Sequence, residues 1–259
     1  MSRVLAFDFG ASTGRAILAE YNGEKIEYNE IHRFDNVLCE QNGMLCWDFD
    51  YLLGEVKKAI SLAENADSLA FDTWGVDYGM LDRTKGMTDK IYQSVSPSKL
   101  YAKTGNQIMP INTLFQLTAD GTDNAEMFLF MPDLFAYSLC GAKSVDKTIA
   151  STSQMLDLEN VEWQKDIFAL SGKNEKILPP IVNCATVVGE YNGIKVIKVA
   201  GHDTQCAVSA MPCDENITNA FLSCGTWSLI GCESDLPILT EKSMNDELSN
   251  ELGANGKIN

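Results

Sequence analysis

The sequence is poor in metal-binding side chains at regular spacing. It has only two histidines, His32 and His202, and its eight cysteines include no C-x-x-C pair. Structural zinc sites usually combine cysteines and histidines at short, fixed intervals. The pattern therefore argues against a zinc site, and we expect the cysteines to be buried free thiols.

The sequence also lacks a long apolar run. No stretch approaches the roughly 20 apolar residues that a helix needs to cross a bilayer. Residues Met1–Arg3 lead directly into a short apolar segment, without the apolar core of a secretory signal peptide. We therefore expect a cytoplasmic protein whose thiols stay reduced.

Basic residues are scarce: 20 lysines and arginines stand against 36 aspartates and glutamates, a formal net charge of −16. Such a balance disfavours nucleic acids and anionic membranes as partners, because both would be repelled. A nucleotide can still be held by local donors together with Mg²⁺. With 259 residues, 45% of them hydrophobic, the chain is long enough for one large domain or two ordinary ones.

The segment that organises the chain is VLAFDFGASTGRAI, residues 4–17. Val4–Phe7 is a continuous apolar run, which predicts a central strand buried on both faces. Asp8 then places a carboxylate at the strand end, and residues 10–15 supply glycines, hydroxyls and a guanidinium that suit a phosphate and its metal ion. The alternative is a β-hairpin in which the glycines serve only the turn and Asp8 is solvated.

Local patterns predict the order β-β-β-α-β, the opening of a ribonuclease-H-like domain. A second strand follows the first turn, and Asn22-Gly23 is a strong hairpin signal before a third. Asp50 is a candidate N-cap for a helix with one apolar face. Ser68–Tyr78 then returns to strand and carries DTWGVDY, where Trp74 faces either a ligand or the core.

Two further helices are expected, and each has a recognisable end. Met131-Pro132 begins one helix, because proline is tolerated in the first turn, and Gly141 is its C-cap. Residues 162–170 predict another, with Trp163 and Ile167 on one face and Gly172 at its end. Residues 101–117 are interpreted as a loop that leads into a helix after Pro110. These segments are interpreted as structural.

The pattern of a strand followed by a turn of small residues then recurs later in the chain. A strand over residues 194–200 is followed by GHDT and a small-residue helix, and residues 220–230 predict two strands about a Ser-x-Gly-Thr turn. Two such turns, at residues 10–14 and 223–226, could clasp a nucleotide between similar half-structures. Asp203 would then lie beside the transferred phosphoryl group as a base, although a role as helix N-cap is the alternative, and the two roles are compatible.

These residues together resemble the FGGY family of carbohydrate kinases. The resemblance rests on motifs spread over nearly the whole chain, among them FDFGASTGR (7–15), DTWGVDYG (72–79), TGNQIMPINTLFQL (104–117), GHDT (201–204) and SCGTWSLIGCES (223–234). The last two are highly specific for the family. TWGVD and QxxPxNTLxQL are similar to its rhamnulokinase group.

The resemblance implies an α/β protein with an actin-like ATPase (ribonuclease-H-like) fold and only the start of a second such domain. Residues 1–195 would form the N-terminal, sugar-side domain, and 196–259 the beginning of the nucleotide-side domain. The implied reaction transfers the γ-phosphoryl group of ATP to the 1-hydroxyl of a small-molecule ketose, L-rhamnulose, with Mg²⁺. The implied roles are Asp203 as catalytic base; Gly75, His202, Asp203 and Thr204 as sugar contacts; Ala11, Ser12, Thr13, Gly14, Arg15 and Thr226 as ATP contacts; and Asp8 as the Mg²⁺ ligand, through water.

The sequence departs from the family pattern in two places. GMLD joins RTKG directly at Asp82 and Arg83, where the family has a longer segment, and the chain stops at Asn259, before a further family helix and the remaining ATP contacts. The alternative hypothesis is therefore a catalytically inactive sugar- or nucleotide-binding relic, or an interaction subunit of kinase descent. The intact Asp8, Asp203 and Thr226 favour the enzyme.

Overall fold

The computed structural model describes residues 2–41, 44–77, 84, 86–121, 125–214, 219–225 and 228–259. Its main element is a six-stranded mixed sheet with the order β11-β12-β6-β1-β2-β3. β1 pairs with β2 antiparallel and with β6 parallel, and β12 continues the parallel part. The strands of this sheet are β1 (Ser2–Phe9), β2 (Thr13–Tyr21), β3 (Ile26–Asp35), β6 (Ser68–Thr73), β11 (Thr186–Tyr191) and β12 (Ile194–Lys198).

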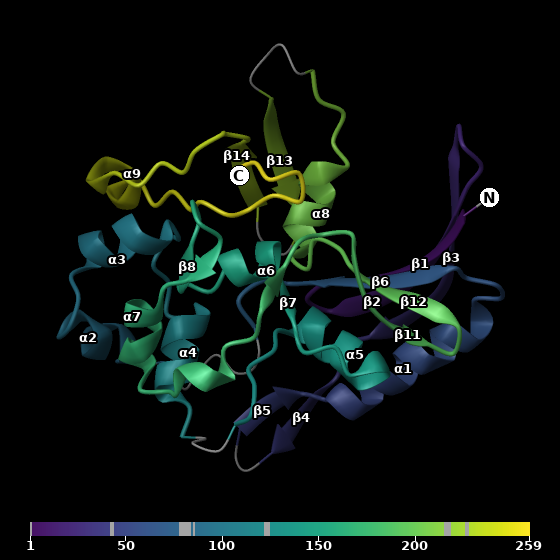
Figure 1. Ribbon diagram of the computed structural model, residues 1–259, viewed down its shortest axis with the longest axis horizontal. Helices are drawn as coiled ribbons and strands as arrows, with labels where there is room; N and C mark the ends of the chain where they lie inside the picture. The colour runs from purple at the N-terminus through teal and green to yellow at the C-terminus, as the bar shows by residue number, and fades with distance from the viewer. Residues whose placement is uncertain are drawn as a thin grey trace.

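Helices pack on one face of this sheet and form a separate layer beside it (Figure 1). α1 and α5 cover the sheet face, whereas α2, α3, α4 and α7 gather at the other side of the molecule. The helices are α1 (Phe49–Leu62), α2 (Met87–Tyr92), α3 (Pro97–Thr104), α4 (Thr113–Ala119), α5 (Met131–Cys140), α6 (Lys147–Ser151), α7 (Lys165–Phe168), α8 (Asp203–Ser209) and α9 (Glu241–Asn245).

Short strand pairs lie outside the main sheet. They are β4 (Leu38–Gln41) with β5 (Met44–Trp47), β7 (Val145–Asp146) with β10 (Ile181–Val182), β8 (Leu156–Asp157) with β9 (Glu162–Trp163), and β13 (Ala220–Cys224) with β14 (Ser228–Cys232). The last pair confirms the two strands predicted about the second turn. Thr226 of that turn lies outside the described residues.

β1 is central, as predicted, but it is not buried equally on both faces. Leu5, Phe7 and Phe9 are fully buried, whereas Val4 and Ala6 are only half-buried. On the buried face Phe9 stacks on Phe135 of α5 with ring centroids 4.7 Å apart, and Phe7 stacks on Phe71 of the neighbouring strand β6 at 4.9 Å. The expectation of two buried faces is therefore wrong, because the described helices that pack against β1 cover only one of them.

The predicted β-β-β-α-β order holds except for the additional hairpin β4–β5 before α1. The N-cap of α1 is Asp48, whose Oδ1 accepts the N–H of Tyr51 at 3.0 Å, and not Asp50, which lies in the first turn. An acid in that turn still interacts favourably with the helix dipole. The strand predicted over Ser68–Tyr78 ends at Thr73, and Tyr78 lies outside the described residues.

Two helix predictions differ in outcome. α5 ends at Cys140 with Gly141 in the left-handed region as its C-cap, as expected. The helix predicted over residues 162–170 is wrong at its start, because Trp163 belongs to β9 and donates its indole N–H to the carbonyl of Pro179 at 2.7 Å. The helical part begins only at Lys165, and Gly172 caps its last turn. Residues 101–104, expected in a loop, form the last turn of α3.

All eight cysteines are free thiols, as expected, but none is fully buried. Cys213, Cys224 and Cys232 are exposed, and the others are half-buried. Within the described ranges, no helix has the length and apolar character needed to cross a membrane.

Candidate active site

The site lies where the carboxyl ends of parallel strands meet. In the β1–β6 register Asp8 lies beside Asp72. The loop that follows β12 continues this arrangement, because the N–H of Thr73 donates to the carbonyl of Gly201 at 2.9 Å and Thr73 forms a parallel bridge with His202. Three carboxylates, those of Asp8, Asp72 and Asp203, are thereby brought close enough to influence one another electrostatically.

Mutual repulsion and burial change the acidity of this cluster. The pKa of Asp72 is well above its usual range because the carboxyl is desolvated and faces Asp8 and Asp203. Desolvation and Asp8 also raise the pKa of Asp203, although His202 and the hydrogen bonds from Thr204 oppose the change. The Asp203 side chain nevertheless keeps 37% of its surface exposed. It is therefore a half-buried carboxylate that a substrate can reach.

Asp203 is the first residue of α8 and not its N-cap, which is His202. Its Oδ1 accepts the N–H of Thr204 at 2.6 Å and lies 3.3 Å from the hydroxyl oxygen of Thr204. The N-cap alternative for Asp203 is thus wrong. The role of base stays a prediction.

The turn after β1 is closed by its own backbone and by a residue that sequence reasoning missed. The N–H of Gly10 donates to the carbonyl of Thr13 at 3.0 Å, and Asn36 binds the carbonyls of Ser12 and Gly10 at 2.8 and 2.6 Å. Ala11 and Ser12 are exposed at its tip. The turn thus presents part of the predicted phosphate loop to solvent.

Thr13, Gly14 and Arg15, the last three residues of that predicted loop, lie in β2. A Cβ atom at Gly14 would lie 2.4 Å from the ring of Phe34, so this glycine makes room for core packing. Arg15 pairs across the strands with Asp8, the predicted Mg²⁺ ligand. The guanidinium therefore occupies one oxygen of that carboxylate.

Gly75 lies directly against the GHDT loop. A Cβ atom there would be 3.0 Å from Nε2 of His202 and 3.3 Å from Cγ2 of Thr152. The next residue, Val76, has a φ of +58°, which is unusual for a β-branched side chain. Its N–H donates to Thr152 Oγ1 at 2.9 Å and its carbonyl accepts the hydroxyl of Thr113 at 2.7 Å. Such strain, held by specific bonds, is common at functional sites.

Trp74 favours the structural interpretation over the ligand-facing one. Its ring packs against that of Trp47 with centroids 4.6 Å apart, and its half-buried side chain packs on the apolar core between the sheet and helices α1 and α5. Both indoles donate to Oδ2 of Asp77, at 2.8 Å from Trp47 and 2.9 Å from Trp74.

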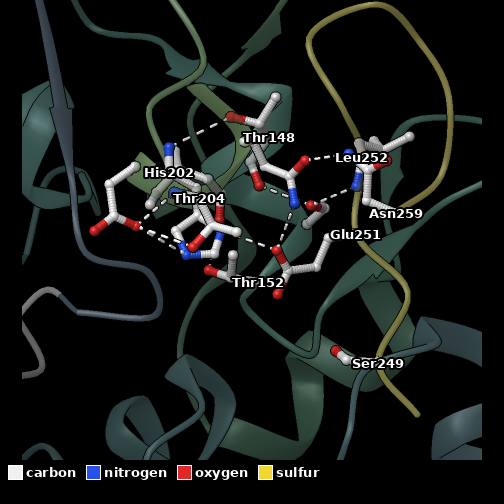
Figure 2. A network of polar contacts seen from close by, with 12 residues as sticks. Thr148, Thr152, His202, Thr204, Ser249, Glu251, Leu252 and Asn259 are labelled. Atoms are coloured by element: carbon white, nitrogen blue, oxygen red, sulfur yellow. Dashed lines mark hydrogen bonds and ion pairs between the residues drawn. The ribbon is translucent and has the colours of Figure 1, made fainter. Parts of the chain in front are cut away.

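A buried polar network surrounds His202 (Figure 2). The backbone of the preceding loop is fixed by Asp146, whose Oδ1 accepts the N–H of Gly201 at 3.0 Å. On the other side, Glu251 Oε2 lies 2.8 Å from Nδ1 of His202. Asp146 and Glu251 were not predicted, because no local motif marks a contact between residues 49 or 55 positions apart.

The chemistry of the carboxylate cluster fits a hydrated magnesium ion. Within the described part of the chain, no group of three histidine, cysteine or acidic side chains is arranged to enclose a metal ion. Magnesium, however, usually keeps several waters and binds one or two carboxylates together with substrate phosphates. Asp8, at the strand end beside two further acids, meets that requirement.

Comparison with known proteins defines the family. Residues 80–220 match the model of the N-terminal domain of the FGGY family of carbohydrate kinases. The chain belongs to this family. It is 35% identical to the rhamnulokinase of Halalkalibacterium halodurans over 289 aligned positions, covering 98% of this chain and 61% of that protein. The rhamnulokinase of Oceanobacillus iheyensis is also 35% identical, with 96% and 60% covered. The chain thus spans about 60% of the length of these relatives.

Solved structures confirm the predicted fold. Ligand-bound xylulose kinase from Lactobacillus acidophilus superimposes with a TM-score of 0.79 at 14% identity, covering 100% of this chain and 59% of that one. Xylulose kinase from Bifidobacterium adolescentis gives a TM-score of 0.75 at 12% identity, with 99% and 63% covered. The chain therefore has the α/β, actin-like ATPase fold of the sugar kinases.

Proposed function

We propose that the protein is an ATP-dependent ketose kinase of the rhamnulokinase type, which converts L-rhamnulose to L-rhamnulose 1-phosphate. The observation that carries this proposal is the half-buried carboxylate of Asp203, which lies close enough to Asp8 to be affected by its charge and directly follows His202, the residue that lies against Gly75. Identity to two rhamnulokinases along nearly the whole chain supports the choice of substrate.

In the proposed reaction Asp203 acts as general base. As the O1 oxygen of the ketose forms its bond to the γ-phosphorus, the bond between that phosphorus and the β–γ bridging oxygen breaks and ADP leaves. The hydroxyl proton passes to the Asp203 carboxylate. Such assistance typically contributes about 10²–10⁴-fold in rate. His202, Thr204 and the space beside Gly75 would orient the sugar.

We assign phosphate binding to the turn between β1 and β2. Ala11, Ser12, Thr13, Gly14 and Arg15 would face the phosphates of ATP, and Thr226, outside the described residues, would add a contact from the second turn. Arg15 would exchange part of its pairing with Asp8 for a phosphate oxygen. Mg²⁺, held by Asp8 through water, would neutralise charge on the phosphates. We further propose that residues 1–195 form the sugar-side domain and 196–259 the beginning of the nucleotide-side domain, in a cytoplasmic enzyme.

The direct test is a phosphorylation assay with MgATP and a panel of ketoses. We expect L-rhamnulose to be phosphorylated at O1 in preference to L-fuculose, L-xylulose and D-xylulose, with phosphorus NMR identifying the product. A higher rate with another ketose would contradict the substrate assignment. Binding of L-rhamnulose without transfer would support the alternative of a catalytically inactive sugar-binding protein.

A further inference from the structure

Contacts of its backbone, of the next residue and of its own carboxylate hold Glu251 against His202. Its backbone N–H donates to the carbonyl of Asn259 at 3.0 Å and its carbonyl accepts the N–H of Asn259 at 2.9 Å. The N–H of Leu252 donates to Ser151 Oγ at 2.9 Å, which ties the same segment to α6. Oε2 of Glu251 then receives Gln205 Nε2 at 2.9 Å and lies 2.8 Å from Nδ1 of His202. Figure 2 shows this carboxylate pointing at the imidazole.

Both ring nitrogens of His202 face a carboxylate oxygen. Nδ1 faces Glu251 at 2.8 Å, and Nε2 lies 3.4 Å from Oδ1 of Asp203. A neutral imidazole has one N–H and one lone pair, so one of these contacts would place a lone pair against an anionic oxygen. The imidazolium offers an N–H on both sides and places its positive charge between the two carboxylates. The positions of the two acids therefore favour the charged ring.

The charges around His202 agree with this geometry. Burial opposes a charge on the ring, but Glu251, Asp203 and Asp72 all face it, and the net result is a raised pKa. Glu251 responds in the opposite direction: its burial is outweighed by His202 and by the hydrogen bond from Gln205, so its pKa is lowered. Both changes in pKa favour the charged forms, in a pair whose side chains are only 10% and 19% exposed.

We propose that Glu251 is a positioning residue that holds His202 as an imidazolium with its positive charge beside Asp203, and so keeps the base of the transfer reaction ionised. The proposal deepens the kinase function above and rests on it for the role of Asp203. Without a fixed positive charge, burial and the repulsion from Asp8 would favour the protonated form of Asp203, which cannot accept a proton.

The test uses the small number of histidines in the chain. With only His32 and His202 present, nitrogen-15 NMR of the two imidazoles resolves each ring, and single substitution assigns them. We expect both nitrogens of His202 to be protonated at pH 7. In Glu251→Gln, which keeps the side-chain shape, the pKa of His202 should fall by about one unit or more, because an opposite charge within hydrogen-bonding distance is lost. Glu241→Gln, an exposed change in the same C-terminal segment, is the matched control and should leave His202 unaltered.

This measurement needs no turnover, so it separates the proposal from the proposed function. A neutral His202 at pH 7 in the unsubstituted protein would overturn the inference even if Glu251→Gln failed to fold, and an unchanged pKa in a folded variant would do the same. In the kinase assay, Glu251→Gln should also move the acidic limb of kcat/KM to higher pH, whereas a purely structural role would leave the limb in place. If the unsubstituted protein shows no kinase activity, that result would contradict the proposed kinase function but not the protonation of His202.

Discussion

Different interactions stabilise the sheet region, residues 2–198, and the segment after Gly201. The sheet region builds an apolar core in which Phe7, Phe9 and Phe135 are completely buried. In the later segment the hairpin β13–β14 leaves Leu222 63% and Ile230 81% exposed. The apolar core therefore lies in the first region, and the hairpin of the second region contributes little to it.

The later segment is attached to the first region by specific polar contacts. Asn250 is buried and donates its side-chain N–H groups to the carbonyl of Gly105 at 2.9 Å and the hydroxyl of Tyr101 at 3.2 Å. These bonds position Glu251, which lies next in the chain. The candidate site is therefore made jointly: Asp8, Asp72 and Gly75 come from the sheet region, and His202, Asp203 and Glu251 from the later segment.

The largest expected effect is on the core of the sheet region. Phe135 stacks on Phe9 and Phe71 with ring centroids 4.7 and 5.4 Å apart, so Phe135→Ala removes contacts with both strands. We expect the free energy of unfolding to fall by about 3–5 kcal/mol, measured by urea denaturation. A loss below about 1 kcal/mol would show that this core contributes little to stability.

The next effect is on catalysis by the later segment. Asp203→Asn should lower kcat for L-rhamnulose phosphorylation by about 100-fold or more, since the amide cannot accept the proton. The melting temperature should stay nearly constant, because Asp203 is half-exposed and is not the helix N-cap. An unchanged kcat would remove Asp203 from the role of base.

A smaller effect concerns pH and joins the two regions. The base works only when ionised, so kcat/KM should fall as the pH decreases through the pKa of Asp203, which burial raises above the usual value. Asp8→Asn removes the carboxylate whose charge raises the pKa of Asp203. The acidic limb of the remaining kcat/KM should then lie at lower pH, even though the overall rate falls with the loss of the predicted Mg²⁺ ligand. A limb that moves to higher pH, or stays in place, would contradict the coupling.

The smallest effect is expected on the exposed hairpin. Ile230→Ser should change the free energy of unfolding by no more than about 0.5 kcal/mol, because the side chain is already in water. Denaturation under the conditions used for Phe135→Ala gives a direct comparison. A loss above about 1 kcal/mol would mean that the hairpin is covered in solution.

The sequence predicted those elements that local patterns encode. The apolar run of β1, the Asn22-Gly23 turn and the Gly141 cap of α5 depend on neighbours in the chain, and all three are present. The helix prediction for Trp163 was wrong because two contacts that the local pattern does not show hold this residue in a strand. Trp163 pairs with Leu156 of β8, and its indole N–H donates to the carbonyl of Pro179. Local periodicity does not report such tertiary contacts.

The candidate site divides in the same way. Asp8, Gly75 and Asp203 lie in recognisable motifs, so their positions could be predicted before the structure. Glu251 could not, because its contact with His202 depends on the return of the chain over α8, the β13–β14 hairpin and α9. The signal is a buried carboxylate with two donors, which is visible only in three dimensions.

The most direct test of the joint site is the affinity for L-rhamnulose of two alanine variants. A Cβ atom at Gly75 would lie 3.0 Å from His202 Nε2, whereas one at Gly54 of α1 would meet no atom within 4 Å. We predict by isothermal titration that Gly75→Ala weakens sugar binding about 10-fold or more, equal to about 1.4 kcal/mol, while Gly54→Ala binds like the unsubstituted protein. Equal affinities in the two variants would place the sugar elsewhere and contradict the account.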